Sequence, residues 1–286
     1  MAILRRAAVC TAALLVSVGC ERAPTMFDVN ERSIAVHALL VAASDTASVL
    51  ITRPSSEVTS WDPMGTSGIT DALVRLIQSN DTITLSGTRV CMRSFGGEMQ
   101  SQGCYTAHVP NGILGGALYE LLVSIPGEAL IRGTTRVPFP AAIIEPNASA
   151  EPPVLRMRNP TLPPTSLPAR WTAASAQARA ELRFATERSD CVATIAPPEG
   201  DIGFDHIAVI GTDTATVTAA SVHCAQPLAT SYAARLVLTV YDESYSRYLE
   251  TIGTKRVRHA AVGLTGALGV FAAAANTATP VVLTRQ

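Results

Sequence analysis

Charged residues are scarce in this chain of 286 residues, and lysine is almost missing. Asp, Glu, Lys and Arg together make up 16% of it, Lys255 is the single lysine, and the formal net charge is -1. Proteins that bind nucleic acid need a cationic face to displace counterions. We therefore expect no nucleic-acid partner. The basic cluster from Lys255 to Arg258 is short and is interpreted as a solvated strand edge.

Long stretches of helical periodicity are also missing. Hydrophobic residues nevertheless make up 48% of the chain, which excludes a disordered protein. Short runs rich in Thr and Val alternate with turn residues, among them 19 Gly and 18 Pro. This pattern is typical of β-sandwiches and barrels. The sequence thus predicts an all-β fold.

The sequence lacks the common catalytic motifs. It contains no Gly-x-Ser-x-Gly elbow, Walker loop, HExxH or Ser-x-x-Lys. Gly263, Gly266 and Gly269 are spaced three apart, which differs from the dinucleotide-binding pattern. We expect neither a catalytic site nor a cofactor. An unrecognised hydrolase stays open as an alternative, because triads are assembled from distant positions.

The His, Cys, Asp and Glu residues suggest two metal sites, which are less favoured than a protein without metal. A zinc site would draw on His206, His223, Cys191 and Cys224, and a calcium site on Glu199, Asp201 and Asp205. Zinc-binding CxxC or HxxxH spacings and EF-hand spacing are all missing. We expect no metal, and we interpret the acidic residues as a solvated loop.

The first 19 residues have the organisation of a secretory signal peptide. Arg5 and Arg6 precede an uncharged stretch from Ala7 to Val18, which small residues close. A transmembrane helix needs about 20 apolar residues, so this stretch is too short to be a permanent span. We expect the segment 1–19 to direct export.

The end of this segment, Val16-Ser17-Val18-Gly19-Cys20, resembles the lipobox of bacterial lipoproteins. The resemblance implies that Cys20 is acylated and becomes the first residue of the mature protein, with 20–32 as a lipidated tether. Several acyl chains give a stable membrane anchor. Glu21 favours the outer membrane. The alternative is an ordinary secreted protein cleaved nearby.

Four cysteines remain in the mature body, an even number that indicates disulfides in an exported chain. Three connectivities are possible. We favour Cys91–Cys104, because Phe95-Gly96-Gly97 between them is a turn signal, together with Cys191–Cys224. Each disulfide is expected to stabilise the fold by about 3 to 4 kcal/mol in the chain-entropy model.

The body divides into two β-rich parts at a proline-rich segment. Residues 33–144 contain about eight predicted strands, enough for one β-sandwich. Residues 145–168 hold seven of the prolines and predict a stiff, exposed linker. Residues 169–286 form a second β-rich domain. Its single predicted helix places Tyr241, Tyr245, Tyr248, Leu249 and Ile252 on one face, and its uncharged stretch 260–275 predicts a buried strand.

Several segments together resemble a family of bacterial outer-membrane lipoproteins, the domain of unknown function 4249. The matching segments are Ile34–Leu40, Val49–Arg53, Asp71–Leu76, Tyr119–Val123, Thr135–Pro138 and Thr265–Phe271. The family has no assigned chemistry. Its members are often encoded beside TonB-dependent receptors, which implies an accessory lipoprotein whose possible partner is an outer-membrane transporter.

Three hypotheses about function follow. The favoured one is a noncatalytic, membrane-anchored lipoprotein that acts as an accessory or ligand-binding protein. A structural or adhesive surface module is the first alternative, which the lack of a pocket between the domains would favour. An unrecognised hydrolase is the second, and it would need a buried His within reach of a Ser and a carboxylate.

Overall fold

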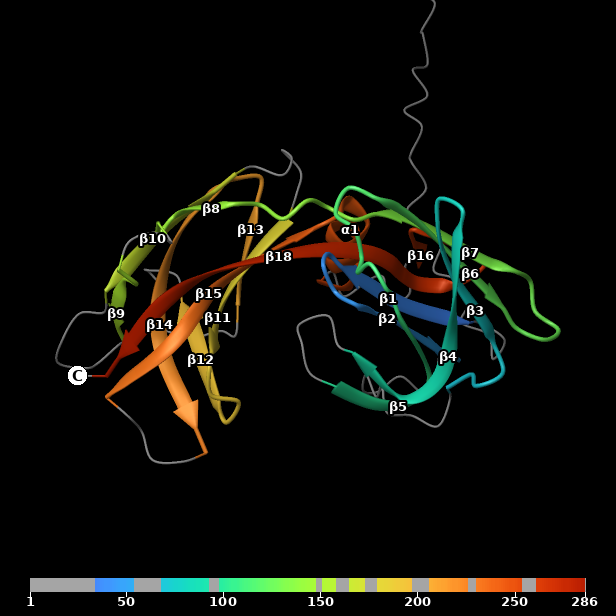
Figure 1. Ribbon diagram of the computed structural model, residues 1–286, viewed down its shortest axis with the longest axis horizontal. Helices are drawn as coiled ribbons and strands as arrows, with labels where there is room; N and C mark the ends of the chain where they lie inside the picture. Colours follow the sequence, from blue (N-terminus) through green and yellow to red (C-terminus); the bar gives the residue numbers. More distant parts are fainter. Residues whose placement is uncertain are drawn as a thin grey trace, which may run out of the picture.

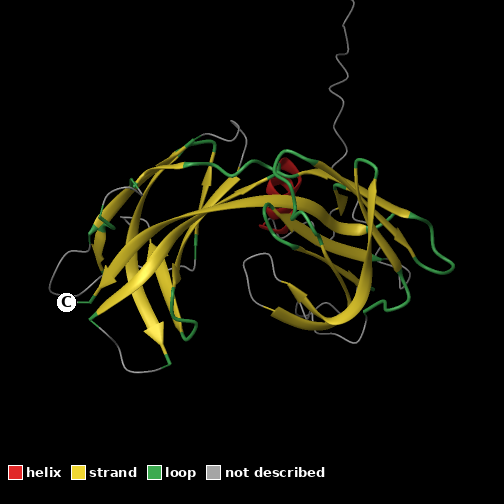
Figure 2. Cartoon of the chain, viewed as in Figure 1, coloured by secondary structure: helices red, strands yellow, loops and turns green. Residues whose placement is uncertain are grey.

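The structure is a computed structural model that describes residues 34–53, 68–92, 98–147, 151–157, 165–172, 179–196, 206–225, 230–253 and 261–285. Strands dominate these residues, and one helix is present among them (Figure 2). The predicted all-β class is therefore confirmed. The signal segment 1–19, Cys20 and the tether 20–32 lie outside the described residues.

The strands and the helix are numbered in the order in which they occur along the chain, and Figure 1 labels most of them. They are β1 (Ala35–Val41), β2 (Thr46–Thr52), β3 (Leu73–Gln78), β4 (Asp81–Met92), β5 (Glu98–His108), β6 (Leu118–Ser124), β7 (Ile131–Arg136), β8 (Ile143–Glu145), β9 (Val154–Arg156), β10 (Ser166–Trp171), β11 (Arg179–Thr186), β12 (Cys191–Ala196), β13 (Ile207–Ile210), β14 (Thr214–Cys224), β15 (Ser231–Tyr241), α1 (Glu243–Gly253), β16 (Ala261–Val262), β17 (Leu264–Thr265) and β18 (Leu268–Thr284).

The first lobe, β1 to β7 with β17, closes around its own hydrophobic core. Its strands follow the order β1-β2-β5-β4-β3-β6-β7-β17 in the large mixed sheet. The sheet folds over because β4 pairs with β3 through its first half and with β5 through its second half. Alternating residues such as Val74, Leu76, Tyr119 and Leu121 fill the interior.

The second lobe, β8 to β15, is a sandwich of two sheet regions. One is the β13-β11-β15-β18 part of the large sheet, and the other is the separate sheet β12-β14-β10-β8. Buried residues from both meet in a second core, among them Leu182 and Leu236 from the first sheet and Trp171 and Ile195 from the other. Each lobe thus has a sandwich-like layered core.

Strand β18 belongs to both lobes. Its first part pairs in parallel with β1, from Leu268 to Ala274, and its remainder pairs antiparallel with β15. Phe271 and Ala273 therefore enter the first core, whereas Val281 and Leu283 enter the second. In Figure 1 this strand bridges the two halves of the molecule. Within the uncharged stretch 260–275, residues 268–275 are consequently buried strand, as predicted, and the described residues before them form two short strands separated by bends.

The structure differs from the sequence prediction in the proline-rich segment 145–168. Its described residues join the second lobe, since β9 pairs in parallel with β18 and β10 lies between β8 and β14. Leu155 is fully buried in the second core. The segment was predicted to be an exposed linker, but its described residues form strands, and Pro168 itself lies within β10 opposite Thr216 of β14. Residues 148–150 and 158–164 lie outside the described part.

The helix α1 covers the junction of the lobes. Tyr241, Tyr245, Tyr248 and Leu249 pack against Val270 and neighbouring small residues of β18. The rings of Tyr241 and Tyr245 stack with centroids 4.5 Å apart. The tyrosines at helical spacing thus serve core packing. Among the described residues, no helix is long and apolar enough to cross a membrane.

The glycines at 263, 266 and 269 have a backbone role. All three have positive φ, and Gly269 reaches 99°, a conformation that glycine adopts without steric cost. A Cβ at Gly269 would meet the backbone carbonyl of Val36. The glycine therefore allows β18 to lie directly against β1.

Candidate ligand-binding cleft

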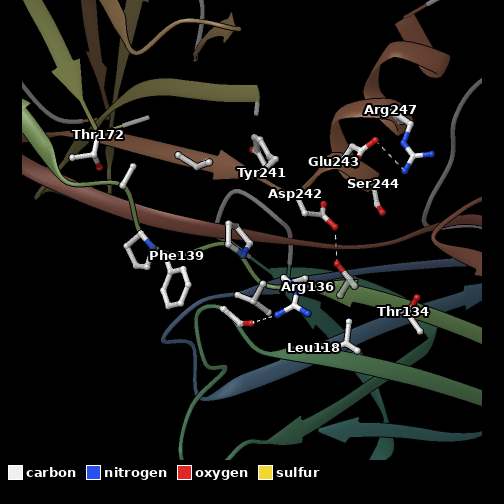
Figure 3. A pocket seen from close by; sticks show the side chains of 17 residues that line it. Leu118, Thr134, Arg136, Phe139, Thr172, Tyr241, Asp242, Glu243, Ser244 and Arg247 are labelled. Atoms are coloured by element: carbon white, nitrogen blue, oxygen red, sulfur yellow. Dashed lines mark hydrogen bonds and ion pairs between the residues drawn. The ribbon is translucent and has the colours of Figure 1, made fainter. Parts of the chain in front are cut away.

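A cleft of about 670 Å³ lies where the two lobes meet (Figure 3). One wall comes from the first lobe, with Leu118 of β6 and Thr134 to Arg136 of β7. The opposite wall comes from the end of β15 and the first turn of α1. The connecting residues 137–141 close the floor between these walls. The cleft therefore depends on segments more than 100 residues apart.

An exposed aromatic ring dominates the connecting segment. Phe139 is 72% exposed, the largest value among the exposed large hydrophobic residues. Its ring lies against the backbone of Gly116, where a Cβ would collide with it. Leu118, also lining the cleft, is 53% exposed. A ring that is held in place and still open to solvent offers a preformed apolar contact.

Polar groups of both signs surround this apolar part. The Arg136 guanidinium donates to the backbone oxygen of Gly116 at 2.8 Å, which orients it beside the cleft. On the facing wall, Arg247 lies 3.5 Å from Glu243, one helical turn away. Both pairs are exposed, so they contribute little to stability. They remain able to exchange partners with a ligand.

Asp242 links the two walls. Its Oδ2 accepts a hydrogen bond from the buried Thr135 hydroxyl at 2.6 Å, and its Oδ1 accepts from the Tyr245 backbone N–H at 2.9 Å. The second bond caps the N-terminus of α1. Burial raises the pKa of Asp242 above its usual range, and these hydrogen bonds oppose the rise. The carboxylate thus has structural partners on both oxygens.

A buried polar pair lies behind the same wall. The Tyr241 hydroxyl donates to Glu181 at 2.8 Å, and the Arg179 Nε donates to the same carboxylate at 3.2 Å. Glu181 is 3% exposed. Burial, followed by the Glu181 charge, raises the pKa of Tyr241. Tyr241 therefore stays protonated as a donor and holds the carboxylate in place.

Both predicted cysteine pairs are bonded. Cys91 joins Cys104 with Cα atoms 5.4 Å apart, and Cys191 joins Cys224 with Cα atoms 4.0 Å apart. The first is a cross-strand link between β4 and β5. The turn residues 95–97, on which we based that pairing, lie outside the described residues.

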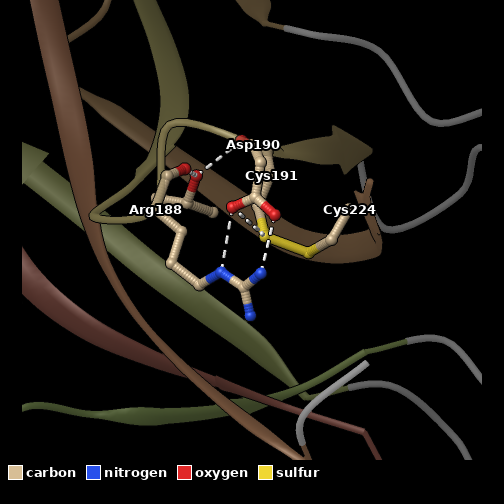
Figure 4. Close-up of polar contacts among 5 residues, drawn as sticks. Arg188, Asp190, Cys191 and Cys224 are labelled. Carbon is tan, nitrogen blue, oxygen red and sulfur yellow. Dashed lines mark hydrogen bonds and ion pairs between the residues drawn. A yellow bond between two sulfur atoms is a disulfide. The ribbon is translucent and has the colours of Figure 1, made fainter. Parts of the chain in front are cut away.

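The second disulfide lies at the end of the smaller sheet (Figure 4). Cys191 and Cys224 stand opposite each other in the β12–β14 ladder. The preceding turn is held by Arg188, whose Nε and Nη2 donate to the Asp190 carboxylate at 2.9 and 2.6 Å. Thr186 donates to the Cys191 carbonyl at 2.6 Å. These contacts fix the turn that connects β11 of the large sheet to β12 of the smaller sheet, and they lie outside the cleft.

This disulfide removes two of the four zinc candidates, because a bonded sulfur is not a thiolate ligand. The other two lie on different sheets. His206 directly precedes β13, and its Nε2 lies 3.9 Å from the Glu181 carboxylate. His223 is on β14, and its Nε2 lies 2.9 Å from Ser221 Oγ. In the described ranges, no three metal-ligating side chains gather. The calcium candidates Glu199, Asp201 and Asp205 lie outside those ranges.

The cleft residues were not singled out as a site from the sequence. The motif Thr135-Arg136-Val137-Pro138 was noted for a family resemblance alone. One local signal was available, since Phe139 stands between two prolines and so cannot lie in the interior of a regular ladder. The Thr135–Asp242 contact spans 107 residues, and nothing in the local sequence indicates it.

No family model matches the chain, and no curated protein does. Solved structures that are similar include a cytokine receptor complex, with 10% identity over 73% of this chain and 85% of that one, at a TM-score of 0.22. Another is CfaE, the adhesive subunit of CFA/I fimbria of enterotoxigenic Escherichia coli, with 9% identity over 88% and 87%, at 0.24. A CfaE mutant scores 0.23 with 10% identity over 89% and 86%. Scores this low carry no argument about fold or function.

Proposed function

We propose that this protein is a noncatalytic bacterial lipoprotein, exported by its signal peptide and held at the outer membrane by acyl chains on Cys20. Its β-rich body binds a ligand or a partner protein in the cleft between the lobes. The lipobox-like Val16–Cys20 supports the anchor. The resemblance to outer-membrane lipoproteins suggests a TonB-dependent receptor as the partner.

The cleft is the observation that carries the binding function. Its volume of about 670 Å³ falls within the range of about 300 to 1,000 Å³ that is usual for small-molecule pockets. It combines an exposed aromatic ring with oriented polar groups, as such pockets do. A purely structural or adhesive module has no need of a concave site at this junction, so the cleft favours a binding protein.

The body in this proposal consists of two β-sandwich-like lobes. Two separate clusters of buried residues support that organisation. The lobes share β18 and touch through Thr135 and Asp242. Thr134 to Arg136 of β7 and Tyr241 of β15 bring one strand from each lobe to the cleft, and Phe139 stands on the segment that connects the lobes.

The environment of Asp242 supports a noncatalytic role. Each of its oxygens accepts a hydrogen bond from the protein, so the carboxylate serves as a helix cap and lobe contact.

The anchor is tested by the variant Cys20→Ala. We expect it to leave the membrane fraction and to lose metabolic palmitate labelling, while its body stays folded, because the acyl chains provide the attachment. Cys10→Ala, within the same export segment, is the matched control and should retain both. Membrane retention of Cys20→Ala without label would overturn the lipoprotein proposal.

The cleft is tested by photocrosslinking in native membranes. A photoreactive phenylalanine analogue at Phe139 should give a specific adduct with a ligand or partner, because this ring is open to solvent inside the cleft. The matched control is the same analogue at Val192, which is 56% exposed on β12. Equal adducts at both positions would show nonspecific contact and would contradict a binding cleft.

A further inference from the structure

Two exposed leucines lie at one end of the first lobe, and we call them the tip. Leu73 begins β3 opposite Ser124 of β6, and Leu130 directly precedes β7. They are 46% and 44% exposed. Ser124 of β6 lies between them, one strand spacing from each, so their backbones are about 10 Å apart. The tip therefore presents apolar side chains to solvent on the outer face of the sheet.

Arginines form the next row of the same face. Arg75 stands opposite Leu122 of β6, and Leu122 stands opposite Arg132 of β7. Because residues two apart on a strand share a face, the Cα atoms of these arginines lie about 7 Å behind those of the leucines. Arg132 is exposed, and the Arg75 Nε is buried without a hydrogen-bond partner. Long arginine side chains can extend along such a face.

Charges of both signs surround the tip. Asp71 is exposed next to Leu73, and Glu120 of β6 stands on the same face as Leu122, one row beyond the arginines. Glu128, in the turn before Leu130, pairs with Arg53 at 2.8 Å. Arg75 and Arg132 are the cationic groups of this face that stand next to the leucines.

The described chain begins beside this tip. The Ile34 carbonyl accepts a hydrogen bond from Leu268 N at 2.8 Å, and Gly266, two residues earlier, packs against the backbone of Leu130. The 13 residues between Cys20 and Ile34 span at most about 45 Å when extended. A lipid on Cys20 is therefore joined to the body at this end.

We propose that the tip and its arginine row rest on the bilayer that holds the anchor. The leucines enter the boundary between headgroups and acyl chains, and Arg75 and Arg132 contact lipid phosphates. This inference rests on the proposed lipidation of Cys20. Two leucines bind weakly by themselves, but a tether converts weak contact into an intramolecular event at high effective concentration.

This placement orients the cleft. Leu118 and Arg136 stand opposite each other at the far end of β6 and β7. Six residues of extended chain separate Leu130 from Arg136, a distance of about 20 Å. With the tip on the bilayer, the cleft faces away from the surface and stays accessible to a soluble ligand or to a projecting part of a membrane partner.

The test uses the full lipidated protein reconstituted in vesicles of phosphatidylcholine and phosphatidylglycerol. A fluorophore is attached to a single new thiol in Leu130→Cys, in Leu73→Cys or in the control Val154→Cys. Val154 is 55% exposed on β9, at the opposite end of the molecule from β3 and β7 (Figure 1). All three sites are exposed, so the substitutions leave the core intact.

Phospholipids spin-labelled near the headgroup should quench the labels at 130 and 73 at least about twofold more than the label at 154. Adding Arg132→Gln should reduce quenching at 130. Equal quenching at all three sites in protein that floats with the vesicles would overturn the inference and leave the anchor proposal standing. Failure to float would overturn the anchor proposal, and the inference with it.

A protein partner at the tip is the competing occupant. Photocrosslinking from position 130 in native membranes to a protein, with no lipid quenching in vesicles, would assign the tip to that partner and overturn the membrane contact.

Discussion

His37 is a titratable residue whose pKa is shifted by burial. It lies on β1 beneath α1, with its ring 5.9 Å from that of Tyr248 at an interplanar angle of 68°. The Tyr248 hydroxyl lies 3.5 Å from His37 Nδ1. Burial lowers the pKa of His37 from 6.5 to about 4, because the imidazolium would lose its hydration. The neutral ring therefore belongs to the packing between helix and sheet.

Acid is expected to destabilise the protein through His37. The unfolded state binds a proton near pH 6.5 and the folded state only near 4, so the stability contributed by the neutral ring is complete above pH 6.5 and is lost as pH falls from 6.5 to about 4. The loss amounts to about 3 kcal/mol at most. Urea unfolding at pH 7.5 and pH 4 measures it.

In His37→Phe this part of the acid sensitivity should disappear. His108→Gln provides the matched control, because His108 is exposed on β5, and it should behave like the wild type. If His37→Phe lost as much stability between the two pH values as the wild type, the assignment of the acid-sensitive group would be wrong.

At the scale of elements, α1 and β7 are joined by the side chain that begins the helix. Asp242 caps α1 through Tyr245 N and accepts the Thr135 hydroxyl from β7. One carboxylate therefore both caps α1 and connects it to β7, so a single substitution removes both interactions. Loss of a helix cap typically costs about 1 kcal/mol, and a side-chain hydrogen bond contributes about as much.

We expect Asp242→Ala to lower the free energy of unfolding by about 1 to 2 kcal/mol. Thr135→Val should cost about 1 kcal/mol. The double variant should be about 1 kcal/mol more stable than the sum predicts, because both substitutions remove the same bond. Denaturant unfolding of the four proteins measures this coupling. Glu243→Ala, exposed on the same turn, is the control, and strict additivity of the pair would contradict the contact.

At the scale of the molecule, the shared strand β18 makes the first lobe depend on the end of the chain. Phe271, Ala273 and Leu264 are buried in a core otherwise built from residues 34–137. β18 also supplies the parallel partner of β1. Removing it would expose a strand edge and open the core.

A fragment of residues 33–144 should therefore fail to unfold cooperatively, despite containing the Cys91–Cys104 disulfide. The same fragment joined through a flexible linker to residues 261–285 should regain a cooperative transition, because β18 and its core residues are restored. Thermal unfolding followed by circular dichroism compares the two. A cooperative transition in the short fragment would mean that the first lobe is an autonomous domain.

Much of the fold could be predicted because its cause is local. Alternating apolar residues place one side of each strand inside, as in β6, where the residues from Leu118 to Ser124 alternate between more exposed and buried positions. The tyrosines at helical spacing indicated α1 for the same reason. The cysteine number predicted two disulfides with three possible connectivities, and the favoured one, Cys91–Cys104 with Cys191–Cys224, is the one that forms.

The prolines of 145–168 misled the prediction, since proline forbids pairing at its own nitrogen but leaves neighbouring residues free to pair. Leu155 is buried there because β18 lies beside it. No property of the local segment specifies that neighbour.

What the sequence by itself determined is the strand content, the one helix, the cysteine pairs and the anchor hypothesis at Cys20, each carried by residues close together or by a short motif. Only the tertiary structure decided where the cleft lies. Phe139 becomes a site residue because Gly116 supports its ring, and Asp242 because Thr135 meets it across 107 residues. Such contacts depend on how the sheets close over their cores. Residues that meet after more than 100 intervening positions carry no periodic pattern that would indicate the contact.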